Sequence, residues 1–321
     1  MSEPKTENSS IIIVNPKSQG GATENNAILD KIFKQSYHKS KIIYTKKEGD
    51  ATRITRYYLK RGYKEVVAVG GDGTINEVAN GFFVYDERTD NMKIINPKAI
   101  FSFIPSGTRN VFANSLNLPM NLDDYFKKKE KCKPKKIDVI SVKYTYSGTN
   151  TLRKPRLCLN AVEIGAGAEI IERSKLVRNK VNSRLLSTIT GIIATLPSYE
   201  SNLCEMIIDD EITIKPNITM CIISNGQYLG GSFKVAPQAQ IDDGFLDIII
   251  VKNSGSFKLL KEIMSMKNGV YFEKRNILYF RAKRIYVESK EREVSVSLDG
   301  EPVGNLPASF NILKKQLPVR F

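Results

Sequence analysis

The chain has 321 residues, 41% hydrophobic and 26% charged, which suits two globular domains with sizeable cores. Its apolar runs are too short for a membrane-spanning helix, which needs about 18 residues or more. Lysines and arginines outnumber acids by 49 to 34, and the net charge of +15 favours phosphorylated ligands or an anionic membrane surface; without a zinc-finger, RNP or helix-turn-helix signature, no nucleic acid partner is expected.

The N-terminus and the cysteines indicate a cytoplasmic protein. Residues 1–8 are polar, lack the apolar core of a signal peptide and are expected to form a disordered tail. The cysteines are scattered without a CxxC pair, which is typical of reduced thiols rather than of disulfides or a zinc site. They are Cys132, Cys158, Cys204 and Cys221.

Strands and helices are expected to alternate in the first part of the chain. Strands are predicted at residues 11–14, 41–44, 65–69 and 100–104, and helices at about 23–35, at 50–61, from Thr74, and from Thr108 to about Leu116. Gly62 follows the second helix as a C′ glycine. Buried strands separated by helices predict an α/β domain with a parallel sheet flanked by helices, in which ligands bind beyond the carboxyl ends of the strands.

The second part of the chain is expected to be rich in strands. Residues 127–136 (KKKEKCKPKK) are either a solvated connector or a phosphate-binding patch. Beyond them, strands are predicted at 137–146, 156–162, 204–208, 219–224, 245–251, 284–288 and 294–298, and helices only at about 168–196 and 256–266. This pattern favours a β-sandwich as the second domain. Lys175, Arg178, Lys180 and Arg184 belong either to a membrane-facing surface or to a solvated helix face.

Three turns that follow predicted strands have the composition of phosphate-binding loops. In Gly70-Gly71-Asp72-Gly73-Thr74 the glycines allow a sharp turn, and Thr74 with Glu77 has capping-box spacing at the start of a helix, where an anion is favoured. The segments 15–21 (NPKSQGG) and 105–108 (PSGT) offer similar geometry. Each turn alone is equally compatible with an ordinary surface turn. Together at one sheet edge they favour a polyphosphate site, although neither a Walker A loop nor a GxGxxG motif is present.

Carboxylates are the candidates for proton transfer, because the only histidine, His38, lies in a polar stretch. Asp72 lies inside the glycine turn, and residues 242–247 (DDGFLD) suit oxygen coordination of Mg²⁺ or Ca²⁺. For the segment Asp299-Gly300-Glu301, the spacing alone favours a simple hairpin turn.

These motifs together resemble the diacylglycerol kinase catalytic-domain family, in its bacterial and archaeal branch of YegS-like lipid kinases, distant relatives of the NAD kinases. The segments that carry the resemblance are residues 11–21, 66–82, 103–119, 225–251 and 296–302. Their order, with GGDGTxNEV followed by DDGxLD and LDGE, is more specific than GGDGT alone. The resemblance covers the chain from Ile11 onward.

The resemblance implies an N-terminal domain like that of NAD kinase and 6-phosphofructokinase, followed by a β-sandwich. The expected boundaries are 9–136 with 308–321 for the nucleotide domain and 137–307 for the acceptor and metal domain. ATP is expected in the interdomain cleft. Its expected contacts are Asn15, Lys17, Ser18, Gln19, Thr45, Gly71, Asp72, Gly73, Thr74, Ile75, Asn76, Glu77 and Thr108.

The resemblance also implies the metal ligands and the catalytic base. A structural Mg²⁺ would be held by the Asp243 carboxylate and the backbone carbonyls of Gln240 and Phe245. Glu301 would be the proton acceptor, which replaces the hairpin interpretation, and Asp72 would organise the catalytic Mg²⁺.

Two positions depart from the family pattern. Val111 stands where the family often carries aspartate after GTxN, and Gly167 replaces an acid near the cleft; Glu163 or Glu169 are candidates to compensate. These departures put the identity of the acceptor in doubt.

The resulting hypothesis is an ATP-dependent kinase that phosphorylates a diacylglycerol-like lipid alcohol. The enzyme would work in the cytoplasm and make transient contact with the anionic inner face of the membrane. Whether it forms a homodimer is an open question. The alternatives are a soluble-substrate kinase of the NAD-kinase type and a weakly catalytic nucleotide-binding regulatory protein.

Overall fold

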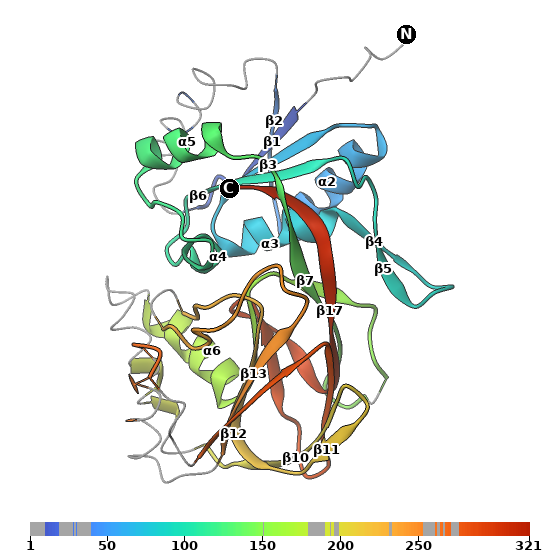
Figure 1. Cartoon of the computed structure of the whole chain (residues 1–321), viewed down its shortest axis with the longest axis vertical. Helices are drawn as coiled ribbons and strands as arrows, with labels where there is room; N and C mark the ends of the chain where they lie inside the picture. The colour runs from blue at the N-terminus through green and yellow to red at the C-terminus, as the bar shows by residue number, and fades with distance from the viewer. Residues whose placement is uncertain are drawn as a thin grey trace. The chain divides into compact units, whose positions relative to one another are not determined.

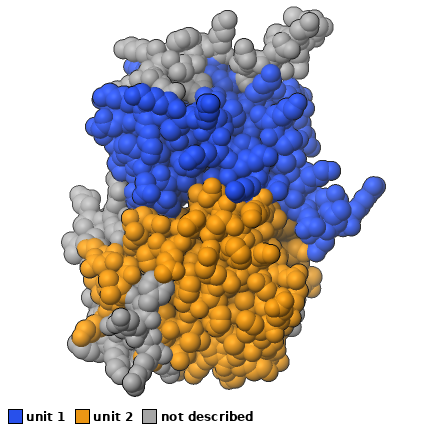
Figure 2. Space-filling model, viewed as in Figure 1, with its two compact units in different colours: residues 1–137, 315–321 blue, residues 138–314 orange. Residues whose placement is uncertain are grey.

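The computed structural model (Figure 1) divides into two compact units, which Figure 2 shows in separate colours. Unit 1 comprises residues 1–137 and 315–321, and unit 2 comprises residues 138–314. The structure describes residues 10–18, 28, 30, 40–149, 151–178, 190–192, 194–195, 199–230, 233–252, 261, 264–265, 267–270 and 276–321. The expected tail at 1–8, most of the helices expected at 23–35 and 256–266, Gln19 and His38 lie outside these residues.

Unit 1 is built on strands that pair in parallel. They are β1 (Ser10–Val14), β2 (Lys41–Tyr44), β3 (Glu65–Gly70), β6 (Ile100–Pro105) and the final residues of β17 (Glu301–Arg320). β1 pairs with β2 and β3, β3 pairs with β6, and Val319 and Arg320 pair with β6. The apolar side chains of residues 11–14 and 66–69 are fully buried, because continuous hydrophobic runs suit a sheet covered on both faces.

Helices cover this sheet and connect its strands. α2 (Asp50–Lys60) packs against α3 (Asp72–Gly81), and α3 packs against β3. The short α4 (Val111–Ser115) and α5 (Leu122–Lys131) follow β6. Gly62 has a φ of 84°, so the predicted C′ glycine after α2 is confirmed. A separate hairpin of β4 (Phe83–Asp86) and β5 (Asn91–Ile94), visible as the teal projection in Figure 1, has no counterpart among the predicted elements.

Helix α5 corrects the prediction of a connector at residues 127–136. The Asn121 side chain accepts hydrogen bonds from the N–H groups of Asp123 and Asp124 and so caps the helix. Acids then occupy the first turn and lysines the last, which complements the helix dipole. The first half of the lysine-rich stretch is therefore the C-terminal half of a helix, and its last two residues begin β7 (Lys135–Thr145).

Unit 2 contains an antiparallel sheet that closes on itself in a barrel-like ring. Successive pairings run from β10 (Asn202–Ile208) to β12 (Asn217–Ser224), β9 (Ala161–Gly165), β16 (Ser295–Leu298), β17, β15 (Arg284–Ser289) and back to β10. The remaining strands extend from these. β11 (Ile212–Ile214) pairs with β10, β13 (Leu246–Lys252) pairs with β12, β14 (Ile277–Ala282) pairs with β13, and β8 (Arg156–Cys158) pairs with β7. Aliphatic side chains from these strands form the larger core cluster of the unit.

Two predicted elements of unit 2 have different bounds in the structure. The run at 156–162 is two strands, β8 and β9, separated by the turn at Leu159 and Asn160. The helix expected at 168–196 begins earlier, as α6 (Ala166–Arg178), which packs against β9, β12 and β16.

Candidate functional site

Hydrogen bonds join the three predicted phosphate-binding turns of unit 1. The Asn15 side-chain amide donates to the Thr74 hydroxyl at 3.0 Å, which links the first turn to the second. The Ser106 hydroxyl donates to that of Ser18 at 3.3 Å, which links the third turn to the first. The Ser106 N–H also donates to the Gly70 carbonyl at 3.0 Å. The structure thus brings together side chains that lie up to 88 residues apart in the sequence.

The second and third turns approach each other through two glycines. A Cβ at Gly107 would lie 2.4 Å from the Cα of Gly71, and a Cβ at Gly71 would lie 3.1 Å from the Cα of Gly107. The Asn110 side-chain oxygen accepts the Gly107 N–H at 2.9 Å and holds the third turn in place. Close backbone approach of this kind is what glycine allows.

Helix α3 starts directly in the glycine turn. Its N-cap is Gly71, in extended conformation, so the N–H groups of the next residues have no acceptor within the helix. A helix N-terminus attracts anions through these N–H groups and through its dipole. Asp72 lies in this first turn, and its Oδ1 accepts the Phe112 N–H at 3.2 Å, which ties α3 to α4.

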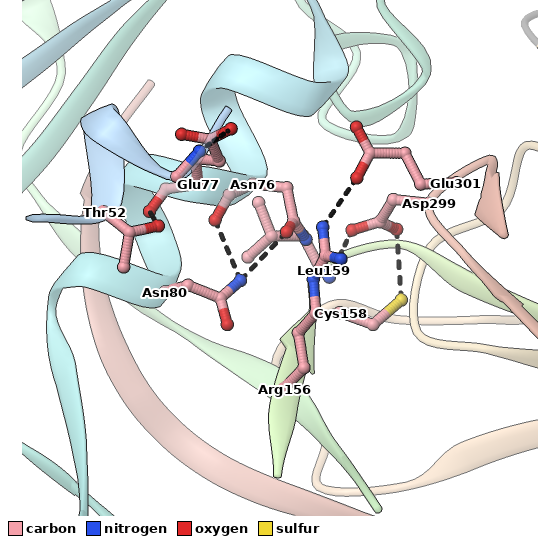
Figure 3. Close-up of polar contacts among 10 residues, drawn as sticks. Thr52, Asn76, Glu77, Asn80, Arg156, Cys158, Leu159, Asp299 and Glu301 are labelled. Atoms are coloured by element: carbon pink, nitrogen blue, oxygen red, sulfur yellow. Dashed lines mark hydrogen bonds and ion pairs between the residues drawn. The ribbon is translucent and has the colours of Figure 1, made fainter. Parts of the chain in front are cut away.

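The predicted capping box of Thr74 and Glu77 is wrong. No side chain caps α3, because Thr74 accepts from Asn15 and Glu77 points to another helix. The two carboxylate oxygens of Glu77 accept the N–H groups of Gly49 and Ala51 at 3.0 and 3.1 Å, at the start of α2. Figure 3 shows the contact that complements this one, from the Thr52 hydroxyl to the Glu77 carbonyl.

The other expected nucleotide contacts of unit 1 fall into two groups. Thr45 follows β2, and its N–H donates to the Val14 carbonyl at 2.9 Å, so it lies beside the first turn; Lys17 is exposed on that turn. Ile75 and Asn76 are buried. The Asn80 side-chain amide donates to the backbone carbonyl and to the side-chain oxygen of Asn76 (Figure 3). Thr108 is half-buried in the third turn, while Gln19 lies outside the described residues. The side chains of Ile75 and Asn76 therefore serve the packing of α3.

In unit 2, Glu301 is held by an arginine from a distant strand. Its Oε2 accepts a hydrogen bond from the Arg156 guanidinium at 2.6 Å, and both side chains are about one-third exposed, at 35% and 27% (Figure 3). A charge-assisted bond of this length fixes the direction of the carboxylate. Arg156 was not among the predicted site residues.

The turn before Glu301 is a two-residue hairpin, as the spacing indicates. Asp299 and Gly300 have φ values of 49° and 81°, which suits a type I′ turn between β16 and β17. The Asp299 carboxylate accepts the N–H groups of Leu159, Asn160 and Ala161 at 2.8 to 3.1 Å. Burial and the charge of Asp299 raise the pKa of the adjacent Cys158 thiol well above its usual value.

The segment 240–245, which we name the DG loop, carries the predicted metal ligands Gln240, Asp243 and Phe245. Gly244, with a φ of 84°, donates its N–H to the buried Asp138 carboxylate at 2.6 Å. Asp243 Oδ1 accepts the Phe245 N–H at 2.9 Å, and Asp243 Oδ2 accepts from the Arg281 guanidinium. Both oxygens of the predicted carboxylate ligand therefore already carry a donor.

The two predicted magnesium positions differ in how well their residues fit the ion. Among the described residues, no three His, Cys, Asp or Glu side chains form a group that could hold a metal. Asp72 fits a magnesium that arrives with a nucleotide, since its carboxylate lies in the glycine turn at the start of α3 and oxygen is the donor that Mg²⁺ prefers. Asp243 does not fit, because the guanidinium of Arg281 already contacts its carboxylate.

A buried acid lies next to one of the two family departures. A Cβ at Gly167 would lie 3.2 Å from the Cβ of Glu163, which is fully buried on β9. Glu169 is instead on the surface of α6, 3.9 Å from Arg173. Of the two proposed compensating residues, only Glu163 thus lies beside Gly167. Val111 is the first residue of α4.

Comparison with known proteins gives two family matches that cover most of the chain. Residues 9–142 match the diacylglycerol kinase catalytic domain, and residues 160–321 match the YegS C-terminal NAD kinase beta sandwich-like domain. A diacylglycerol kinase of Staphylococcus carnosus (strain TM300) is 29% identical over 303 residues, which cover 91% of this chain and 87% of that protein.

Solved structures share the fold. A diacylglycerol kinase from Bacillus anthracis str. Sterne has a TM-score of 0.67 at 24% identity, covering 99% of this chain and 98% of the other. Yeast NADH kinase complexed with NADH has a TM-score of 0.51 at 11% identity, covering 99% and 87%.

The fold is therefore the two-domain fold shared by diacylglycerol kinases and NAD kinases, with a C-terminal β-sandwich-like domain. The chain belongs to the diacylglycerol kinase family and, within it, to the lipid kinases with a YegS-type C-terminal domain. The predicted family is confirmed.

No helix among the described residues has the length and apolar character needed to cross a membrane.

Proposed function

We propose that this chain transfers the γ-phosphate of ATP to the hydroxyl group of a diacylglycerol-like lipid alcohol. The observation that carries the proposal is the joining of three turns in unit 1 through Asn15–Thr74, Ser18–Ser106 and the Gly71–Gly107 approach. A polyphosphate needs several N–H and hydroxyl donors around it, and joined turns at a helix N-terminus supply them. The names of the curated relatives, diacylglycerol kinase, support the acceptor class.

The nucleotide would bind largely through backbone groups. In this proposal the N–H groups at the start of α3 receive phosphate oxygens, and the exposed Lys17 supplies a counter-charge. Ser18, Thr45 and Thr108 add hydroxyl groups, and Gln19 belongs to the same predicted set. The proposed domain boundaries remain 9–136 with 308–321 for the nucleotide and 137–307 for the acceptor.

Positioning and charge compensation would supply most of the rate. Magnesium bound with the nucleotide neutralises charge on the phosphates, and Asp72 is the residue proposed to hold it. The acceptor oxygen bonds to the γ-phosphorus, the bond from that phosphorus to the β–γ bridging oxygen breaks, and the acceptor proton passes to Glu301. With Oε2 of Glu301 held by Arg156, Oε1 is the oxygen assigned to the proton.

The proposed acceptor also implies a membrane partner. A lipid alcohol resides in a bilayer, so the kinase must contact a membrane surface transiently at its cytoplasmic side. The net charge of +15 supports contact with anionic lipids. A homodimer remains a separate prediction.

An assay with radiolabelled ATP tests the proposal. The protein is incubated with Mg²⁺ and, in parallel, with vesicles that contain diacylglycerol, an ether analogue, a long-chain base or no lipid alcohol. Labelled lipid in the first arm is the expected result. Labelled NADP⁺ from an arm with NAD⁺ and no lipid would instead support the NAD-kinase type. ATP binding without transfer in any arm would support a nucleotide-dependent regulatory protein.

Substitution of Glu301 tests its role separately. We expect Glu301→Gln to lower kcat by about 10²-fold or more while the KM for ATP stays within about twofold, since general-base catalysis contributes about 10²–10⁴-fold. A Glu301→Gln protein that is as active as the parent would remove Glu301 from the base role.

A further inference from the structure

The DG loop concentrates acidic groups that need a compensating positive charge. Asp243 lies in the loop, Asp247 follows it on β13, and the Asp138 carboxylate accepts the Gly244 N–H. The Asp247 side chain is only 1% exposed, and its Oδ2 has no hydrogen-bond partner. Acids in such surroundings are stable only beside a cation or a donor.

Arg281 supplies the positive charge from the neighbouring strand. It lies directly opposite Asp247 in the antiparallel pairing of β13 and β14, and its Nε is 4.0 Å from Asp247 Oδ1. A terminal nitrogen of the same guanidinium contacts Asp243 Oδ2. One planar group can reach two carboxylates in this way because it presents five N–H donors.

The aromatic ring of Phe245, in the DG loop, also contacts the Arg281 guanidinium. The central carbon of Arg281 lies 4.8 Å from the ring centre of Phe245, whose own N–H donates to Asp243. Contact with an aromatic face stabilises a cation. Arg281 therefore touches the loop at a carboxylate and at a ring, and it is only 41% exposed.

We propose that Arg281 is a built-in cation that takes the place of a metal ion at the DG loop, so that this loop is held without an ion at Asp243. A divalent cation on Asp243 would lie beside the guanidinium and be repelled by it. The proposal concerns only the DG loop; magnesium that arrives with the nucleotide is a separate matter, and the test below contains no nucleotide.

Thermal unfolding with and without divalent cations tests this proposal. For the unchanged protein we expect the same melting temperature, within about 1 °C, in EDTA, in MgCl2 and in CaCl2. Arg281→Met leaves Asp243 and Asp247 without a cation, so its melting temperature should fall by roughly 2–6 °C in EDTA and rise again, saturably, with Mg²⁺ or Ca²⁺. Arg281→Lys keeps the charge and should show little cation response.

Two further variants serve as controls. Arg284 lies on the next strand, β15, and forms a surface ion pair with Asp210. Arg284→Met removes this guanidinium and should create no cation dependence. Adding Asp243→Asn to Arg281→Met should abolish the cation response. Terbium luminescence excited through tyrosine should likewise appear on Arg281→Met and disappear in the double variant.

Either of two results would overturn the proposal. The first is a saturable rise in the melting temperature of the unchanged protein with Mg²⁺ or Ca²⁺ that Asp243→Asn removes. The second is an Arg281→Met protein that folds but melts at the same temperature in EDTA and in either cation. If Arg281→Met does not fold, the first comparison and Arg281→Lys still decide the question.

Discussion

Two glycines meet where the second and third turns of unit 1 approach each other. Because a Cβ at Gly107 would lie 2.4 Å from the Gly71 Cα, the limit at this position is space. The φ of Gly107 is not in the positive range, so any residue could adopt its backbone conformation. A single added methyl group must therefore push the two turns apart.

Gly107→Ala is expected to weaken ATP binding about tenfold or more, since inserting a methyl group into close-packed structure costs about 1–3 kcal/mol. Calorimetric titration with ATP measures the effect. The control is Gly148→Ala, which has a positive φ but open space around its Cβ and should lose some stability without losing ATP affinity. Unchanged ATP affinity in Gly107→Ala would argue against a phosphate site between these turns.

Glu77 illustrates how a motif residue can serve a neighbouring helix. We expect Glu77→Ala to destabilise the protein by about 1–2 kcal/mol, because it removes acceptors from the N–H groups of Gly49 and Ala51. The KM for ATP should change less than about twofold. Urea unfolding and steady-state kinetics check the two halves, with the exposed Glu48→Ala as the matched control. A large rise in KM with little change in stability would restore the predicted nucleotide contact.

At the scale of elements, α5 carries a lysine in its buried face. Lys129 is 6% exposed, and burial lowers the pKa of its ammonium group to about 8, while Glu65 acts to raise the pKa and Arg320 to lower it. Between this value and the usual 10.5, the folded state binds fewer protons than the unfolded state. Lys129 therefore adds stability as the pH rises through this window, and below pH 8 its buried charge is a cost.

Lys129→Met should be more stable than the parent at pH 7, and the difference should shrink by up to about 3 kcal/mol as the pH rises from 8 to 10.5. Urea unfolding at several pH values measures it. Comparing the two proteins cancels groups that titrate in both, such as the buried thiols. Lys127→Met, which removes an exposed lysine from the same helix, is the matched control. A constant difference for Lys129→Met would show that the lysine does not titrate in this window.

The elements that could be predicted from the sequence are those determined by local patterns. The parallel-paired strands of unit 1 read as short apolar runs, and the glycine turns follow them directly. No strand was predicted in the range of β17, because Pro302, Pro307 and Pro318 count against a strand, although such residues are tolerated where no ladder donor is needed. Helix α5 was missed because its lysine run resembles a linker, while its cap, Asn121, gives only a weak signal.

The candidate site divides in the same way. Its three turns could be predicted, since each carries small residues after a strand. Arg156 and Arg281 could not, because they meet Glu301 and Asp243 only through pairings 145 and 38 residues apart in the sequence. A basic residue on a strand has no local feature that identifies its partner.

At the scale of the whole molecule, the cysteines are distributed unequally between the interior and the surface. Cys158, Cys204 and Cys221 are buried, and only Cys132 is partly accessible. Burial raises the pKa of the Cys204 thiol to about 12 and raises that of Cys221 further, so thiolate, the reactive form, is scarce at these positions.

The native protein is therefore expected to expose one fast-reacting thiol to DTNB, and the other three should react only when the protein unfolds. Absorbance of the released thiolate counts them. Cys132→Ser should remove the fast phase and leave the slow phase unchanged. A fast phase of two or more equivalents in the native protein would contradict the burial of the other thiols.

Because β17 ends in unit 1, the sheet of unit 1 can be completed only at the end of synthesis. Unit 1 includes residues 315–321, and Val319 and Arg320 pair with β6, with Leu317 and Val319 fully buried. A ribosome that has finished β6 must still translate all of residues 138–314 before that neighbour exists. At about 5–20 residues per second this delay lasts roughly ten to forty seconds. During this delay, the edge of the phenylalanine-rich β6 that later pairs with β17 has no neighbouring strand. A chaperone that shields exposed strand edges therefore has the most time to bind unit 1, which is synthesised first.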